Sequence, residues 1–109
     1  MDAREQRLAK NETIFRDVNE RIEEAAAAQL IDPHVFEFLC ECSNIDCTLR
    51  LPLTLGAYES VRDDPAQFVV APGHDLPEIE EVVHRTAGYQ VVRKHGAAAE
   101  LAENRDPRS

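Results

Sequence analysis

The first part of the chain has the spacing of an amphipathic helix. Between residues 3 and 29, apolar side chains recur at alternating three- and four-residue intervals, which places them on one helix face. These positions are Leu8, Phe15, Val18, Ile22 and Ala25, with the polar Asn11 in the remaining place. Asp32 and Pro33 end the pattern, because the residue before a proline is disfavoured in the helical region. We predict one long helix within residues 1–31, which either packs on its own domain or pairs as a short coiled coil with a second copy or a partner.

Two segments with a period of two follow, separated by the four residues Ser43–Asp46. The even positions of residues 36–42 are Phe or Cys, with Glu37 and Glu41 on the opposite parity. In residues 47–53 the odd positions are Cys or Leu. Alternation of this kind is typical of half-buried strands. We therefore predict an antiparallel hairpin whose two apolar faces point the same way.

A short helix and a short strand are predicted next. Thr54 suits the N-cap of a helix, because its hydroxyl can accept a backbone hydrogen bond, and Asp64-Pro65 stops that helix. The apolar side of this helix consists of Leu55, Tyr58 and Val61. The apolar run Phe68–Val70 predicts a strand that leads into the turn Pro72–His74.

The last third of the chain predicts a second hairpin and a third helix. Residues 82–85 and 89–94 form the hairpin, with Gly88 at a turn position that needs a positive φ. A helix over residues 78–85 is the alternative, since a proline followed by glutamates is a good helix start. The paired valines favour the hairpin. Residues 96–109 predict a short Ala-rich helix and a polar tail.

Three cysteines lie close together around the loop of the first hairpin. Cys40 and Cys42, two apart on a strand, project to one face, and Cys47 begins the returning strand on that same face. We expect the three sulfurs to converge as a tetrahedral zinc site requires. Soft thiolates favour zinc, or alternatively an iron–sulfur cluster, over magnesium or calcium. An odd, clustered set of cysteines in a reducing compartment indicates metal or redox chemistry rather than disulfides.

The predicted fourth metal ligand is His74. It follows a strand expected beside the hairpin and lies in a Pro-Gly turn that can approach an ion closely. Asp75 is interpreted as an acceptor that orients its imidazole, or as a solvated turn residue. The alternatives for the fourth position are a water molecule, Asp46, His34, His84 and His95.

Together these patterns predict an α+β fold, in which a long N-terminal helix accompanies a small antiparallel sheet pinned by the zinc site. A single domain over residues 1–109 is expected, with the N-terminal helix at 1–31, a zinc-binding α+β core at 35–95, and a short helix with a polar tail at 96–109. Aromatic residues are few, with two Tyr, four Phe and no Trp. The core is therefore small, and a metal cross-link would add stability that it lacks.

The chain is acidic, with a formal net charge of −9. This charge argues against nonspecific binding to nucleic acid, because phosphates are repelled over most of such a surface. A slight excess of basic residues in 84–109 is interpreted as a solvated tail. No secretory segment and no apolar run of membrane length is found. We expect a soluble cytoplasmic protein without a membrane contact.

Catalysis has little support from the sequence. The zinc-deaminase pattern H-x-E with P-C-x-x-C, a serine nucleophile elbow and a phosphate-binding glycine loop are missing. The acidic pairs Glu23-Glu24 and Glu80-Glu81 are interpreted as solvated. We expect a non-enzymatic zinc-binding module that contacts a protein partner, or a second copy, through its long helix and acidic surface. The alternatives are a thiol-based redox or metal sensor, and a small zinc enzyme with an open coordination position and Glu41 or Asp75 as base.

Three motifs also resemble a known family. The segments C-E-C-x4-C at 40–47, V-V-A-P-G-H at 69–74 and N-E-x-I-F-R-x-V-N-E-R-I at 11–22 look like a family of small uncharacterised proteins of high-GC Gram-positive bacteria. The resemblance extends to the D-P-R ending at 106–108 and implies one compact domain, with no activity attached. The C-x-C opening is also similar to the CDGSH iron–sulfur proteins, which use three Cys and one His. Here the third cysteine comes early and the C-D-G motif is missing, which disfavours such a cluster.

Overall fold

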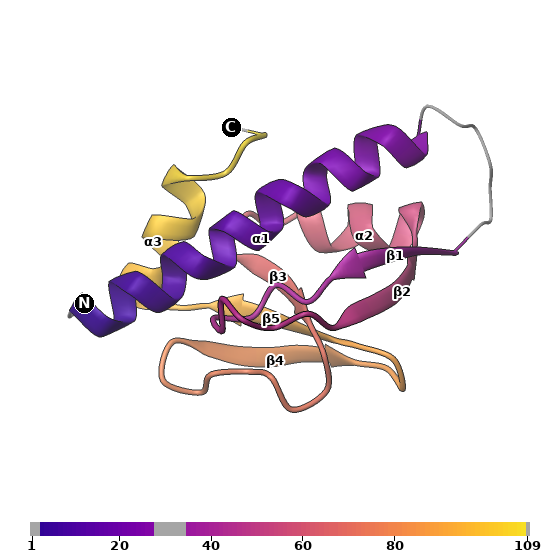
Figure 1. The fold of residues 1–109 in the computed structure, drawn as a ribbon. Coiled ribbons are helices and arrows are strands. Elements are labelled where there is room, and N and C mark those ends of the chain that lie inside the picture. The colour runs from indigo at the N-terminus through magenta and orange to yellow at the C-terminus, as the bar shows by residue number, and fades with distance from the viewer. Residues whose placement is uncertain (1–2, 28–34, 109) are drawn as a thin grey trace.

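A long N-terminal helix lies across two small antiparallel sheets (Figure 1). The computed structural model describes residues 3–27 and 35–108. In chain order the elements are α1 (Ala3–Ala27), β1 (Val35–Leu39), β2 (Arg50–Thr54), α2 (Leu55–Arg62), β3 (Gln67–Val70), β4 (Glu80–Arg85), β5 (Gln90–Lys94) and α3 (Gly96–Asn104). This is the predicted α+β fold. None of the helices in these ranges combines the length and apolar character needed to cross a membrane.

The strands form one pair and one three-stranded sheet. β1 pairs with β2, and the order in the other sheet is β3-β5-β4, with all neighbours antiparallel. Figure 1 shows the helices on one side of the strands and β4 at the opposite edge. The predicted second hairpin is thus confirmed, and the alternative helix over residues 78–85 is wrong. The paired valines Val82-Val83 and Val91-Val92 favour this outcome, because β-branched residues are enriched in strands.

The glycine expected at a positive φ is not the one in the β4–β5 turn. Gly73 and Gly96 have φ values of 83° and 57°, whereas Gly88 is not in this region. A Cβ on Gly88 would instead lie 3.2 Å from Cγ of Pro52, so the glycine allows two hairpins to approach each other. The chemistry of the turn was therefore misjudged, although the hairpin itself is correct.

The predicted short elements in the middle of the chain are confirmed. Thr54 is the N-cap of α2, and its hydroxyl accepts a hydrogen bond of 3.1 Å from the backbone N–H of Ala57. Tyr58 and Val61 are buried on the inner side of that helix. The Tyr58 ring stacks on Phe38 with centroids 4.5 Å apart and the planes 9° from parallel. This stack joins α2 to β1 at the centre of the core.

The first hairpin is shorter than predicted, and its loop is longer. β1 ends at Leu39 and β2 begins at Arg50, so Cys40 and Cys42 lie just after the first strand and Cys47 lies in the loop, and none of the three is on a strand as predicted. The last link to β2 is the hydrogen bond of 3.1 Å from Cys40 N–H to the carbonyl of Leu49. The next backbone N–H, that of Glu41, donates to the carbonyl of Val69 in β3 at 2.7 Å. The chain therefore leaves one sheet for the other directly after β1, which a two-residue alternation does not reveal.

Helix α1 buries a polar face, contrary to the prediction. Among the α1 side chains that the structure describes, the buried ones other than Ala26 are polar, namely Glu12, Thr13, Arg16, Asn19 and Glu20. Of the predicted apolar stripe, Ile22 is half-buried against the core, whereas Val18 is 40% exposed. The helix packs on the domain because partners for the polar groups stand beneath it. The predicted helix end at Asp32-Pro33 lies outside the described residues.

One buried charge cluster joins α1 to the larger sheet. Lys94 of β5 forms ion pairs with Glu12 of α1 and Glu80 of β4, and the Lys94 side chain is 1% exposed. Its Nζ also lies 5.0 Å from the ring centroid of Phe68, a cation–π distance. Glu80 is therefore buried, whereas its local sequence had indicated a solvated residue. Burial raises the pKa of Glu12 well above its ordinary value, although Lys94 acts in the opposite direction.

A second charge cluster ties the C-terminal residues to the helices. Arg62 of α2 donates from Nε to Glu20 of α1 at 2.6 Å and also pairs with Asp106. Arg108 donates to Glu20 at 2.9 Å and to Glu59 at 2.8 and 2.9 Å. The pKa of Arg108 is raised chiefly by its hydrogen bonds to Glu59. The expected solvated tail is thus wrong for this part of the chain, because both ends of the D-P-R motif have ionic partners.

Candidate metal centre

The three cysteines and His74 come together from two turns of the backbone. Cys40 and Cys42 follow β1, Cys47 lies in the loop before β2, and His74 lies in the turn after β3. One sulfur from each cysteine and one ring nitrogen of His74 all lie within 4.8 Å of one another. The sequence-predicted ligand set is therefore assembled in space, although Cys47 reaches it from a loop instead of a strand.

The separations match the edges of a tetrahedral site. Nδ1 of His74 lies 3.6 Å from Sγ of Cys40 and 3.8 Å from Sγ of Cys47. Zinc bonds of about 2.3 Å to sulfur and about 2.0–2.1 Å to nitrogen, at tetrahedral angles, separate those two ligand atoms by about 3.6 Å. One ion could therefore bind all four atoms with small adjustments of the side chains.

The turn after β3 positions His74. Its N–H donates to the carbonyl of Ala71 at 3.0 Å, and Gly73 supplies the positive φ that this tight turn requires. The N–H of Ala71 in turn donates to Sγ of Cys40 at 3.1 Å. A backbone donor to sulfur favours the thiolate form, which is the form that binds metals. The same turn thus supplies one ligand and orients another.

The loop between Cys42 and Cys47 is closed by Asn44. The carbonyl of Asn44 accepts from Cys47 N–H at 2.9 Å, and its side-chain Oδ1 accepts from Asp46 N–H at 3.0 Å. Such Asx turns reverse the chain within a few residues. Cys47 is thereby returned to the two cysteines of the preceding segment.

The sulfurs have unequal proton affinities in the chain by itself. The hydrogen bond between Cys40 and Cys42 lowers the pKa of Cys42 to about 5, with help from His74. The same hydrogen bond, together with burial, raises the pKa of Cys40. A shared proton between neighbouring thiols explains the opposite directions. One sulfur of the cluster is thus already a thiolate near neutral pH, and a bound cation would favour deprotonation of the others.

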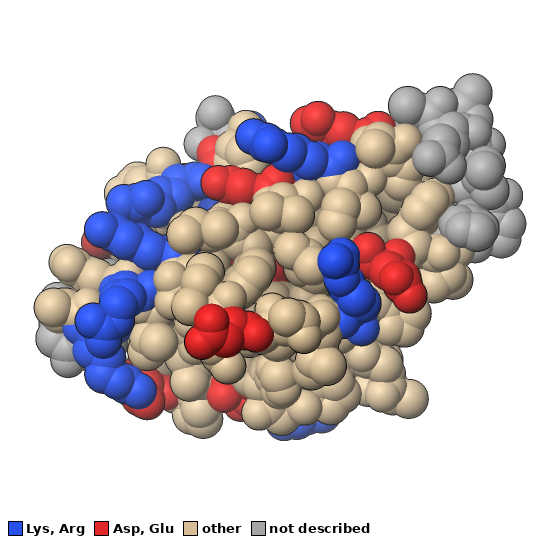
Figure 2. Space-filling view, viewed as in Figure 1, with Lys and Arg blue, Asp and Glu red and all other residues tan. Residues whose placement is uncertain are grey.

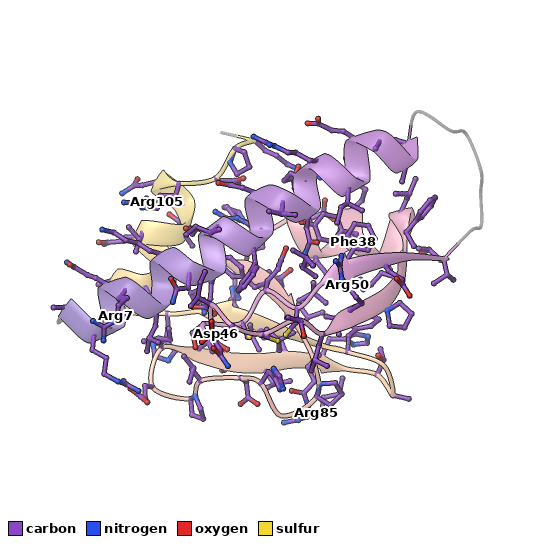
Figure 3. All side chains as sticks on the ribbon, in the orientation of Figure 1. Arg7, Phe38, Asp46, Arg50, Arg85 and Arg105 are labelled. Atoms are coloured by element: carbon purple, nitrogen blue, oxygen red, sulfur yellow. The ribbon has the colours of Figure 1, made fainter. Side chains whose placement is uncertain are left out.

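Access to the centre is from one side. Cys40 and Cys42 are buried, whereas Cys47 and His74 are half-buried. A shallow cavity of about 280 Å³ opens beside them. Its lining consists of Cys42, Ser43, Asn44, Gly73, His74, Asp75 and Leu76. Figure 3 shows the sulfur atoms close to the labelled Asp46, between the loop and the larger sheet.

The other residues considered from the sequence do not join this group. Asp46, His84 and His95 are exposed and outside the set of four, and His34 lies outside the described residues. Glu41 cannot act as a base at the metal, because its carboxylate is fully buried on other partners. Asp75 lines the cavity and is half-buried, so it remains close to the centre.

Asn11 and Asn19 of α1 hydrogen-bond the segment that carries Cys40 and Cys42, and Glu41 of this segment accepts from Asn19; the sequence patterns did not predict these contacts. The Glu41 carboxylate accepts from Asn19, Tyr58 and the Val69 N–H at 2.9, 3.0 and 2.9 Å. Burial raises the pKa of Glu41. Asn11 in the apolar stripe was one available signal, since a polar residue at such a position needs a partner. No family model, curated protein or solved structure matches the chain.

Proposed function

We propose that this protein is a non-enzymatic zinc-binding module with a structural Cys3His site formed by Cys40, Cys42, Cys47 and His74. The observation that carries the proposal is the tight grouping of one nitrogen and three sulfurs within 4.8 Å. Three thiolates and an imidazole fill a tetrahedral coordination sphere, which is characteristic of structural zinc. A catalytic zinc would keep one position for water or substrate, and four protein ligands leave none.

Zinc suits this ligand set better than an iron–sulfur cluster. A two-iron cluster divides its ligands between two metal ions, so that they must lie further apart than around one ion. The sulfurs and the nitrogen are instead close enough to share one ion. Mixed sulfur and nitrogen donors at tetrahedral spacing favour zinc among the common divalent metals.

The module is proposed to act by contacting another protein. The four buried glutamates, Glu12, Glu20, Glu41 and Glu80, are nearly balanced by the buried cations Arg16, Arg62 and Lys94, so the outer surface keeps most of the net negative charge. Figure 2 shows lysines and arginines gathered toward the N-terminal end of this face and a largely uncharged centre. Exposed apolar side chains on α1, such as Ile14 and Val18, support a role of the helix in such contacts. The binding of a partner to this helix remains part of the proposal.

Metal analysis tests the central claim. Protein purified without added metal should contain one zinc per chain, and cobalt substitution should give the absorption of a tetrahedral site with thiolate ligands. His74→Ala should weaken zinc binding by about 10-fold or more, since second-sphere losses alone cost that much. His84→Ala, an exposed histidine on β4, is the matched control and should bind as the wild type does. Colourless, zinc-free protein that takes up neither metal would refute the site.

A redox sensor is a second candidate, because Cys42 borders the cavity and Cys47 is half-buried. In the proposed sensing reaction, the zinc-bound thiolates of Cys42 and Cys47 reduce one molecule of hydrogen peroxide. They form a disulfide, two protons are taken up, two waters leave and the zinc ion is released. Stoichiometric zinc release by a slight excess of peroxide, reversed by a thiol reductant, would favour this function. Zinc that stays bound under these conditions would favour the purely structural one.

A further inference from the structure

The segment that carries two metal ligands is also the segment that α1 contacts. Cys40 and Cys42 alternate with Leu39, Glu41 and Ser43. Each of these three intervening residues makes a hydrogen bond to a side chain of α1. The metal and the helix therefore hold alternate residues of one short stretch of backbone.

Asn19 makes the largest share of these contacts. Its Nδ2 donates to the carbonyl of Leu39 and to Oε2 of Glu41, both at 2.9 Å, and its Oδ1 accepts from Leu39 N–H at 2.7 Å. The Asn19 amide thus satisfies both backbone groups of Leu39 much as a neighbouring strand would. One helical side chain fixes the peptide directly before Cys40 and the side chain directly after it.

Asn11 makes the corresponding contact on the other side of Cys42. Its Nδ2 donates to the carbonyl of Ser43 at 2.9 Å. Both asparagines lie on α1 two turns apart, so one rigid helix sets the positions of both ends of the segment. The Cα–Cβ directions of Cys40 and Cys42 follow from the backbone between these ends.

The docking of α1 is sensitive to this geometry. The only buried apolar residue on the described part of α1 is Ala26, and the other buried side chains on it are polar. Apolar contacts tolerate small shifts, whereas a buried amide or carboxylate that loses its partner costs about 1–3 kcal/mol. A displaced Leu39–Ser43 segment would leave Asn19 and Glu41 without their partners. The helix and the segment must therefore be ordered together.

We infer that metal binding and the docking of α1 are coupled through residues Leu39–Ser43, with Asn19 as the positioning residue. This inference rests on the proposed zinc site. Because such coupling is reciprocal, a docked helix raises the metal affinity, and a bound metal stabilises the docked helix. Loss of the metal then weakens the docking of α1, so that the position of this helix depends on whether the metal is bound.

Zinc affinities of helix variants test the inference. Asn19→Ala should weaken zinc binding by about 10-fold or more, in the range for residues that orient metal ligands. Glu20→Gln, the neighbouring buried residue on α1, is the control, because Glu20 contacts Arg62 and Arg108 and not the metal-binding segment. Its zinc affinity should stay within about three-fold of the wild type, although both changes destabilise the docked helix. Affinities are measured by competition with a chromophoric chelator under reducing conditions.

The outcomes separate the coupling from the metal site itself. Equal losses of zinc affinity in Asn19→Ala and Glu20→Gln would mean that only the overall stability of the fold matters. An unchanged zinc affinity in Asn19→Ala would mean that the helix does not position the ligands. Either result overturns the coupling. Asn11→Ala, at the edge of the interface, decides the question in the same way if Asn19→Ala does not fold. Wild-type protein without zinc affinity would instead refute the proposed function. The cobalt spectrum of the variants should show a shifted thiolate band if the ligand geometry changes.

Discussion

Two regions that α1 contacts use opposite solutions to the same problem of a small core. On the metal side, three cysteines and a histidine lie in turns with little regular structure. On the other side, Lys94, Glu12 and Glu80 are buried together under the helix. The first region relies on ligand atoms that an added ion would join. The second relies on charges that neutralise one another within the chain.

This difference shows how much each region depends on something outside the polypeptide. A buried ion pair forms as soon as the chain folds, and its desolvation penalty is offset only by its own partners. A cluster of thiols gains its stability when an ion binds, so its contribution follows the metal supply. One helix that contacts both regions is therefore fixed permanently at one point and conditionally at another.

The largest expected effect is loss of the metal. Cys42→Ser should unfold much of the sheet, because a structural zinc site contributes several kcal/mol or more to folding, on the order of the whole stability of a small domain. α1 should stay partly helical, since its helix propensity is local. Circular dichroism of the variant should show residual helix without a cooperative melting transition. Chelation of the wild-type protein should lower the melting temperature as well, and an unchanged transition would rule out a structural role of the metal.

The next effect is loss of the cation in the charged region. Lys94→Met leaves Glu12 and Glu80 buried together without their partner, which should lower the free energy of unfolding by about 3–5 kcal/mol. Arg93→Met is the matched control, because the Arg93 side chain is exposed and pairs with Asp64 at the surface. That control should cost no more than about 1 kcal/mol. Denaturant titration of both variants measures the difference, and equal stabilities would mean that the buried cluster contributes little.

The pH dependence of stability should reveal Glu12. Since burial raises its pKa in the folded state, the folded protein binds more protons than the unfolded chain above the ordinary value of 4.5. The stabilising contribution of the neutral carboxyl is complete below that pH and is lost as the pH rises toward the folded pKa. The free energy of unfolding of the wild type should therefore fall, relative to Glu12→Gln, by up to about 1.4 kcal/mol per pH unit.

The Glu12 comparison is made as a difference between the two proteins at each pH from 5 to 8. Contributions from groups outside the charged cluster are common to both proteins and cancel in that difference. A difference that does not change with pH would mean that Glu12 is ionised in the folded protein throughout this range. The charged region would then be a fully ionised cluster and not one with a protonated member.

The smallest stability effect is expected on the outer face of α1. Val18→Glu should change the free energy of unfolding by no more than about 0.5 kcal/mol, because Val18 is not part of the buried polar face. If this face pairs with a second copy, the same change should convert a dimer into a monomer. Light scattering of the wild-type protein over a range of concentrations first shows whether it forms a dimer, since a strict monomer excludes the homodimer. A large loss of stability in a monomer would mean that the apolar stripe packs inward after all.

Elements with a strong local signal could be predicted from the sequence. The N-cap at Thr54, the paired valines of β4 and β5 and the long helix were all recognisable, because each depends on neighbouring residues. The group of candidate ligands was recognisable too, since cysteines in such close spacing have few other uses. Features that depend on residues far along the chain were misjudged, as two examples show. The strand boundary after β1 depends on a hydrogen bond from Glu41 to β3, and the burial of Glu80 depends on Lys94.

The sequence by itself determined the class of the fold and the four candidate ligands of the centre, because residue types and their periodicity suffice for both. Only the tertiary structure decided which face of α1 is buried. A charged residue counts as solvated in any local pattern, and it becomes an interior residue only when distant segments supply its partners. Glu12, Glu20 and Glu41 find theirs in β5, α2 and β3, far along the chain. The same distance in sequence conceals Asn19, whose contacts with the metal-binding segment exist only in the folded chain.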